Sequence, residues 1–294
     1  MQIVGTAGWR LHEYGTVGST NDLARNLPAW SAVRADAQTG GRGRFGRVFV
    51  SDPGGLWISA VLPAEGGTQR WAGFSLMVGI HLVRLLEGFR VPGARLRWPN
   101  DLMSGKKKLG GLLIEQSTRE TLIVGFGLNV RNSPWKTDPA LDVIATSLER
   151  ARAPSLPEPP DSLCHAENRG HGRPARESPD LLGKASAQTG GTPVPPVPTV
   201  PADIPDIFEV AVRTLDVLAD AHQEMQEAGM PGAIRELNRR WAEPVPVRLA
   251  LSGGKQVIGR FAGLDPQGNI RILDDAAGES LVPHQNIEKL WEIY

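Results

Sequence analysis

A proline-rich stretch in the middle of the chain sets the strongest limit on how it can fold. Residues 150–205 hold 12 of the 24 prolines and no Trp, Tyr or Phe. Such a segment cannot bury enough apolar surface to offset the entropy that it loses on ordering. We therefore expect a disordered surface insertion between two structured regions. Cys164, His165 and His171 lie inside it, and incidental residues of a flexible segment explain them better than a metal site.

The composition of the whole chain is that of an ordinary globular protein. Of 294 residues, 40% are hydrophobic and 22% charged, and 32 basic residues balance 32 acidic ones. That balance argues against a general nucleic-acid binder, which usually carries a basic excess. A single cysteine excludes an intrachain disulfide. No secretory signal and no apolar stretch near ~20 residues is present, which predicts a cytoplasmic protein without a membrane partner.

The spacing of apolar residues predicts a mixed α/β region before the insertion. Ser19-Thr20-Asn21-Asp22 precede residues 23–27, which we expect to form a short capped helix, and a longer core-facing helix falls within 69–89. Strands are expected where short apolar runs lie between turn residues, at 32–38, 55–62, 95–98, 109–115 and 121–130.

The region after the insertion begins with helices and ends with strands. An amphipathic pattern over 207–225 predicts one helix, and Gly229 and Pro231 separate it from a second. Short strands with turns then predict a small SH3-like β-barrel over 243–294. The whole is an α+β fold with three parts: a catalytic domain from 1–149 and 206–242, the insertion over 150–205, and the barrel.

The segment from Gly40 to Arg47 is the first candidate for a binding site. It contains four glycines and three arginines in eight residues. Glycine costs about 1 kcal/mol in a regular element relative to alanine, so the segment is a loop. The arginine fork matches carboxylate or phosphate. Because the loop joins two apolar strands, we interpret it as a lid over an anion site. An exposed segment that binds nucleic acid is the alternative.

Two further segments place polar groups beside a strand. Asn100 and Asp101 follow a Trp-Pro pair at a strand exit, where a plain turn is the simpler explanation. Lys108 stands beside Gly110 and Gly111, and glycines in a strand mark the close approach of a ligand. We expect Lys108 to present its ammonium group to a phosphate or carboxylate, and the two lysines before it to form a solvated turn.

Alternating glycines mark the last candidate. Gly125 and Gly127 lie in an apolar strand that leads to Asn129, a pattern that weakens a strand unless something lies flat against one face. The spacing is not the dinucleotide-binding fingerprint. The chain offers no Ser/His/Asp arrangement and no metal-ligand spacing. Cations and backbone donors around anions favour activation of a carboxylate by a nucleotide, where catalysis depends on positioning and charge stabilisation.

Taken together and in this order, five segments resemble those of the biotin protein ligases. They are Ser19-Thr20-Asn21, Gln38 to Arg47, Arg97 to Asp101, Lys108 to Glu115, and Gly125 to Asn129. Each motif alone is weak, but all five in order are highly specific. They cover residues 11–150, and residues 207–294 fit the linking helices and C-terminal barrel of the family. The resemblance implies a class II synthetase-like catalytic domain with a mixed central sheet and packing helices.

The resemblance implies a two-step reaction. Biotin, the substrate, and Mg²⁺-ATP give biotinyl-5′-adenylate and pyrophosphate. A lysine of the biotin carboxyl carrier protein of acetyl-CoA carboxylase then attacks the mixed anhydride, which forms an amide and releases AMP. Family members can pair sheet to sheet, so a homodimer through the sheet is one expectation, and the same edge could receive the carrier domain.

The resemblance also assigns roles to residues. Lys108 would bridge the biotin carboxylate and the α-phosphate, and Arg42 and Arg44 would close over the adenylate, so these three are the expected catalytic residues. No residue is expected to ligate a metal, although Asn100 would assist nucleotide or metal positioning. The full expected set for biotin and ATP binding is Ser19, Thr20, Asn21, Gln38, Gly41, Arg42, Gly43, Arg44, Arg47, Asn100, Lys108, Gly111, Gly125, Gly127 and Asn129.

Three features depart from the family pattern. Arg97 stands where lysine is more frequent, Phe49 stands where tryptophan often follows the arginine loop, and the proline-rich insertion is unusual. The first motif begins at Ser19, which leaves no room for the N-terminal helix-turn-helix of repressor members, so we expect no DNA binding. A lipoate or octanoate ligase or transferase of the same fold is the alternative enzyme. A nucleic-acid-binding module is the alternative from another class.

Overall fold

The computed structural model describes residues 1–66, 68–152, 204–241, 243–274, 278–283 and 286–293. All of these belong to one compact unit formed by residues 1–153 and 204–294. Most of the expected insertion, including Cys164, His165 and His171, lies outside the described residues. No helix within the described ranges is both long and apolar enough to cross a membrane.

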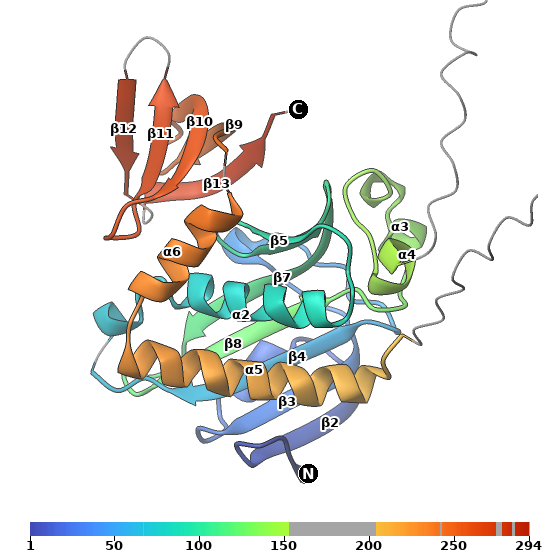
Figure 1. The fold of residues 1–294 in the computed structure, drawn as a ribbon. Coiled ribbons are helices and arrows are strands. Elements are labelled where there is room, and N and C mark those ends of the chain that lie inside the picture. The colour runs from blue at the N-terminus through green and yellow to red at the C-terminus, as the bar shows by residue number, and fades with distance from the viewer. Residues whose placement is uncertain (67, 153–203, 242, 275–277, 284–285, 294) are drawn as a thin grey trace, which may run out of the picture. The chain divides into compact units, whose positions relative to one another are not determined.

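A large mixed sheet forms the centre of this unit (Figure 1). Only β2 and β3 run parallel, and every other neighbouring pair is antiparallel. In spatial order the strands are β1 (Gln2–Val4), β2 (Trp9–Val17), β3 (Ser31–Gln38), β4 (Leu56–Pro63), β8 (Thr121–Leu128), β7 (Lys107–Gln116), β6 (Asp101–Ser104) and β5 (Ala94–Arg97).

The strands of this sheet confirm most of the expected positions and add three. β1, β2 and β6 were not predicted, and β6 begins at Asp101, so the Trp-Pro-Asn segment is the turn of a β5–β6 hairpin. The helix expected at 23–27 is α1 (Thr20–Ala24) instead. Ser19 is its N-cap but makes no side-chain cap bond, and the Thr20 amide donates to the Gln38 side chain. Gln38 therefore stabilises the start of α1.

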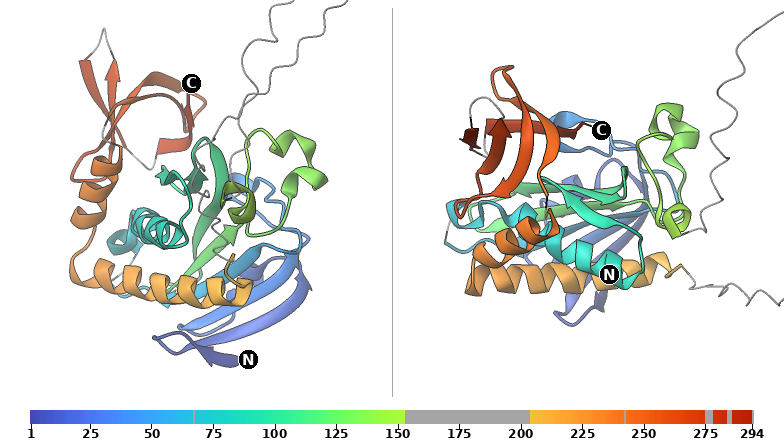
Figure 2. Two further views of the ribbon diagram at one scale, coloured as in Figure 1. Left: turned by 45° about the vertical axis from the view of Figure 1, so that its right-hand side comes forward. Right: turned by 45° about the horizontal axis from the view of Figure 1, so that its top comes forward.

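Two helices cover one face of the sheet (Figure 2). They are α2 (Phe74–Gly88) and α5 (Ile207–Glu227), which pack against each other. The inner residues of α5 also pack on β4, and those of α2 on β5, β6 and β7. Gly229 has a φ of 65°, which ends the helix, and Pro231 starts α6 (Pro231–Arg240). His81, on α2, lies 2.8 Å from a carboxylate oxygen of Glu224 on α5, so it links two packed helices.

A second, smaller sheet follows α6. Its five antiparallel strands are ordered β12-β11-β10-β9-β13, and the bounds are β12 (Gly278–Val282), β11 (Ile270–Asp274), β10 (Gln256–Leu264), β9 (Val245–Leu251) and β13 (Ile287–Glu292). Alternate residues such as Val247, Leu249 and Phe261 are buried on one face. Phe261 packs against Trp241 at a ring-centroid distance of 4.5 Å, which fixes this sheet to the end of α6.

Candidate active site

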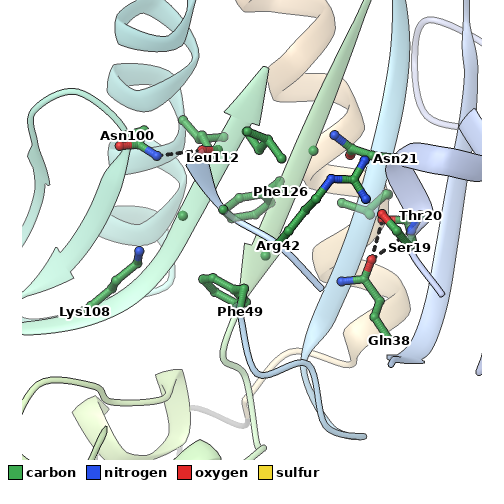
Figure 3. Close-up of a pocket in the computed structure, with 16 residues that line it drawn as sticks. Ser19, Thr20, Asn21, Gln38, Arg42, Phe49, Asn100, Lys108, Leu112 and Phe126 are labelled. Atoms are coloured by element: carbon green, nitrogen blue, oxygen red, sulfur yellow. Dashed lines mark hydrogen bonds between the residues drawn. The ribbon is translucent and has the colours of Figure 1, made fainter. Parts of the chain in front are cut away.

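A pocket opens where α1, β3, β7 and β8 meet (Figure 3). Ser19, Thr20, Asn21 and Gln38 lie on one side of it, and Lys108 and Asn100 lie on the other. Of the residues predicted from the sequence, eleven line this pocket: Ser19, Thr20, Asn21, Gln38, Arg42, Gly43, Asn100, Lys108, Gly111, Gly125 and Gly127. Segments far apart in the chain therefore converge here.

Neutral hydrogen bonds hold the end of the pocket beside α1. Gln38 Oε1 accepts from the Thr20 amide at 2.8 Å and from Thr20 Oγ1 at 3.1 Å. Ser59 Oγ lies 2.7 Å from Thr20 Oγ1 and 2.5 Å from Asn21 Oδ1. Thr20, Asn21 and Ser59 are all buried. Because each group already has a partner, the network fixes where donors and acceptors face the pocket. Ser59 was not predicted, and nothing distinguishes it locally from other strand serines.

An ion-pair cluster adjoins that network. The Arg42 guanidinium donates to both Asp22 oxygens, at 2.6 and 2.9 Å, and lies 3.5 Å from Glu115. The hydrogen bond from Arg42 lowers the pKa of Asp22. Glu115 also accepts from Asn21 Nδ2 at 2.7 Å and pairs with Arg25 at 3.0 Å. Arg42 is therefore tied to α1 and β7. Asp22 and Glu115 were missed as site residues, because their link to Arg42 is long-range.

The glycines of β8 leave space that neighbouring side chains occupy. A Cβ at Gly125 would lie 2.3 Å from Asn21 Oδ1, and one at Gly127 would lie 3.0 Å from the Phe49 ring. The first distance is shorter than real Cβ contacts, and the second is at the tight limit, so a side chain at either position would force its neighbour to move. The expectation that these glycines expose the sheet to a ligand becomes more specific: they admit Asn21 and Phe49, which line the pocket.

Lys108 and Asp101 form a half-buried ion pair at the other wall. Lys108 Nζ lies 2.6 Å from one Asp101 oxygen, and Arg97 lies 2.6 Å from the other. Burial alone would raise the pKa of Asp101, but the charges of Lys108 and Arg97 outweigh it and lower that pKa. Lys108 Nζ also lies 5.4 Å from the Phe49 ring centroid. A Cβ at Gly111 would lie 3.2 Å from Lys108 Nζ. The ammonium group is thus placed at one position.

Beyond Lys108 lies a hollow rich in cations. Arg44 and Arg47 line it and donate to the backbone carbonyls of Ile287 and Glu288, both at 3.4 Å. Burial and the neighbouring Arg47 lower the pKa of Arg44. The hollow lies outside the pocket, so the structure does not bring these two arginines to the pocket wall.

An apolar hollow adjoins Lys108 on another side. Val48, Phe49, Leu141 and Ile144 line it together with Asn129. The Asn129 amide is buried, donates to the Thr146 carbonyl at 2.9 Å, and accepts from Asn132 at 2.9 Å. Asn129 therefore belongs to this hollow and not to the pocket lining.

Two expected residues act through the backbone or a neighbouring strand. A Cβ at Gly41 would lie 2.4 Å from Ser51 Oγ and 2.5 Å from the Phe49 carbonyl, so this glycine lets the two arms of the loop pair closely. Asn100 lines the pocket, and its Nδ2 donates to the Leu112 carbonyl on β7 at 2.8 Å.

Comparisons with known proteins agree with the arrangement. Residues 16–129 match the model of the biotin/lipoate A/B protein ligase family. The chain is 34% identical over 142 residues to a bifunctional ligase/repressor BirA of Bacillus subtilis, which covers 46% of this chain and 44% of that protein. It is 32% identical over 151 residues to a biotin–[acetyl-CoA-carboxylase] ligase of Mycobacterium tuberculosis, covering 47% and 56%. The matches thus span about half the length of these relatives.

Among solved structures, the fold resembles that of a biotin protein ligase from Aquifex aeolicus in complex with biotin and ATP. The TM-score is 0.69 at 22% identity, and the match covers 97% of this chain and 99% of that one. At this identity the similarity concerns the fold, and it includes the large mixed sheet and its helices. The resemblance to the biotin protein ligases predicted from the five motifs is confirmed.

Proposed function

Because residues 16–129 match the model of the biotin/lipoate A/B protein ligase family, we propose that the chain is an ATP-dependent biotin ligase. It activates biotin as biotinyl-5′-AMP and transfers the biotinyl group to a lysine of a biotin carboxyl carrier protein. One observation carries this proposal: Lys108 stands at the boundary of three spaces, a neutral hydrogen-bonding pocket, a cationic hollow and an apolar hollow. An acid, a phosphate chain and an aromatic base can meet there.

The neutral pocket suits the biotin head group, which is an uncharged ureido ring with donors and acceptors. Thr20, Asn21 and Gln38 present matched neutral groups at its closed end. A fixed, buried network of this kind discriminates by leaving unpaired any ligand group of the wrong polarity. The glycines of β8 preserve the shape of the pocket, because a side chain there would displace Asn21 or Phe49.

Lys108 supplies the charge that adenylation needs. The biotin carboxylate oxygen attacks the α-phosphorus, the bond to the β-phosphate breaks, and pyrophosphate leaves with the electron pair. Two anions must approach each other, so a fixed cation between them stabilises the transition state. Asp101 and Phe49 hold Lys108 from two sides, which favours such a role.

The apolar hollow suits the adenine base. Phe49 offers an aromatic face, and Asn129 offers an amide held by Thr146 and Asn132. Phe49 stands where a tryptophan is frequent in the family, so a smaller face is available for stacking. We therefore place the base between Phe49 and the side chains of Leu141 and Ile144.

Mg²⁺ would arrive on the nucleotide. Among the described residues there is no cluster of three or more His, Cys, Asp or Glu side chains that could hold a metal ion. Asp101, one of two acidic residues that line the cationic hollow, already pairs with Arg97 and Lys108. Magnesium commonly binds through substrate phosphates with few protein ligands, which fits this site. The ion would neutralise charge on the phosphates.

Three finer assignments belong to the same proposal. The chain consists of a catalytic domain over 1–149 and 206–242, an insertion over 150–205, and a C-terminal barrel of the SH3-like kind over 243–294. A homodimer or a docked carrier domain would use the edge of the large sheet, where the β2 residues from Glu13 to Thr16 are exposed. The predicted absence of DNA binding stays part of the proposal.

The experiment that tests the function is biotin-dependent ATP–pyrophosphate exchange with Mg²⁺. Lipoate and octanoate serve as parallel acids, and transfer to a carrier domain is measured next. Exchange with biotin alone supports the proposal. Exchange with lipoate or octanoate instead would assign the chain to the other branch of the family. If no acid supports exchange, the proposal is wrong, and steeply salt-dependent nucleic-acid binding would favour the alternative class.

A further inference from the structure

Glu115 on β7 reaches the neutral network through a single side chain. Its Oε2 accepts from Asn21 Nδ2 at 2.7 Å, and its Oε1 pairs with Arg25 at 3.0 Å. A carboxylate offers only acceptors to these neighbours, so it fixes the Asn21 amide with the amino group toward Glu115 and Oδ1 toward Ser59. Glu115 lies outside the pocket lining, whereas Asn21 is part of it. Glu115 therefore acts on the pocket through Asn21.

That orientation gives the network more acceptors than donors. Its contacts run in a row, from Asn21 Oδ1 to Ser59 Oγ at 2.5 Å, on to Thr20 Oγ1 at 2.7 Å, and on to Gln38 Oε1 at 3.1 Å. The Gln38 amide is fixed as well, because its Oε1 accepts from the Thr20 amide. The amide oxygens at both ends only accept, so the hydroxyl groups of Ser59 and Thr20 must supply every proton. Two protons serve three contacts, and one contact stays without a proton.

Burial makes this imbalance costly, and Glu115 maintains it. Thr20, Asn21 and Ser59 are buried, and two buried oxygens in contact without a proton repel each other. Turning the Asn21 amide would direct Nδ2 at Ser59 and supply the third proton. The same turn would place Asn21 Oδ1 against the Glu115 carboxylate, at the 2.7 Å now spanned by a hydrogen bond. Glu115 therefore holds the network in its acceptor-rich state.

We propose that Glu115 is a positioning residue that makes the closed end of the pocket select a ligand with an N–H donor. This rests on the proposed function, because the ureido ring of biotin carries N–H groups. Thr20 and Gln38 both line the pocket (Figure 3), so a ligand N–H can reach the oxygen pair that lacks a proton. A ligand that brings only acceptors would add to the imbalance.

Glu115→Gln tests the inference, because Arg25 determines how the new amide lies. The guanidinium favours the Gln oxygen on its own side, so the amino group takes the place of Oε2 and faces Asn21. Asn21 then turns, and its Nδ2 supplies the third proton to the network. The dissociation constant for biotin, measured by calorimetry on the full chain without ATP, should rise about tenfold, near the upper end of what one neutral hydrogen bond contributes. Glu120→Gln, at an exposed glutamate in the β7–β8 turn, is the matched control and should bind biotin as wild type does.

Ser59→Ala shows whether Glu115 acts through the row of hydrogen bonds. This change removes the link between Asn21 and Thr20, so adding Glu115→Gln to it should alter biotin binding by no more than about twofold. A cyclic carbamate analogue, in which a ring oxygen replaces one ureido N–H, measures the selection itself. The wild-type chain should prefer biotin to this analogue, and Glu115→Gln should reduce that preference about tenfold.

Three results would overturn the inference: wild-type biotin affinity in Glu115→Gln, an equal loss in Glu120→Gln, or the same loss whether or not Ser59 is present. The last would mean that Glu115 acts through Arg42 instead. If the wild-type chain does not bind biotin, the proposed function is wrong, and NMR of the ligand-free chain still decides whether Glu115 orients Asn21. The side-chain amide signal of Asn21 should shift in Glu115→Gln and not in Glu120→Gln, and an unshifted signal would contradict the inference.

Discussion

At the end of the site formed by α1 and β3, Thr20 and Gln38 satisfy each other with neutral hydrogen bonds of 2.8 and 3.1 Å. At the end that faces β13, Arg44 and Arg47 reach only backbone carbonyls at 3.4 Å. The first end is complete without a ligand, whereas the second has an excess of positive charge. A complete neutral network selects by shape and polarity. A charge excess selects by charge and favours a ligand that brings negative groups.

The arginine loop, residues 40–47, contributes a side chain to each end of the site. Arg42 is fixed to Asp22 on α1, and only two residues later Arg44 lies beside β13. Phe45 follows with a φ of 59° and an exposed side chain, a left-handed conformation that costs roughly 1–2 kcal/mol for a residue other than glycine. The loop is thus anchored at one end and strained at the other. An anion bound by the arginines would offset that strain.

The largest expected effect falls at the boundary between the two ends. Lys108→Ala removes the cation that faces both the acid and the phosphate, so biotin-dependent pyrophosphate exchange should fall by about 10²–10³-fold. The control is Lys106→Ala, an exposed lysine two residues earlier. If Lys108→Ala keeps exchange within a few-fold of wild type, Lys108 is not a catalytic residue. The neutral and cationic ends would then share no catalytic residue.

A substitution at the neutral end should act on biotin alone. Gly125→Ala places a Cβ 2.3 Å from Asn21 Oδ1, and overpacking costs about 1–3 kcal/mol. That range corresponds to a rise in KM for biotin of about 5–150-fold, with KM for ATP nearly unchanged. Gly88→Ala is the control, because a Cβ at this exposed position meets nothing within 4 Å. A matching rise in KM for ATP would show that the two ends are not independent.

At the cationic end, Arg44→Ala should loosen the grip on the intermediate. The adenylate is hydrolysable, and a loop that orders over it excludes water. We expect preformed biotinyl-adenylate to be lost about tenfold faster, equivalent to about 1.4 kcal/mol. The measurement is the lifetime of the complex without carrier protein, with Arg119→Ala, in the exposed β7–β8 turn, as control. An unchanged lifetime would mean that Arg44 does not retain the adenylate, and that it acts only on the phosphates of ATP or in holding the loop.

The main residues of both ends were predictable from the sequence, because Arg44, Arg47 and Lys108 at the cationic end also lie in the predicted motifs. Ser19, Thr20 and Gln38 lie in short motifs whose order along the chain identified them. The strand β3, which carries Gln38, follows from an apolar run. The pattern failed for three strands: β1 and β6 have only three and four residues, and the apolar–polar alternation of β2 ends at Glu13. The turn at Asn100 leads directly into β6. The sequence did not predict β6, because its first and last residues are polar.

Tertiary contacts account for the rest. Asp22 was expected only as part of a helix cap, yet it pairs with Arg42, 20 residues away. Lys289 on β13 lines the cationic hollow. Its local sequence does not indicate this, because it depends on β13 lying beside the arginine loop. Both depend on how separate elements pack, which no local spacing records.

Ionic strength should separate the two ends without any substitution. Salt shortens the Debye length from about 10 Å at 0.1 M to about 3 Å at 1 M, which weakens attraction between accessible charges. Pyrophosphate binding should therefore weaken at least about threefold between 0.1 and 1 M KCl, because several half-buried cations attract it. Biotin binding at the neutral network should change little, since its partners are uncharged side chains. Titrations of both ligands across that series decide the matter. Equal salt dependence for the two would mean that the biotin carboxylate, and not the neutral network, dominates recognition of the acid.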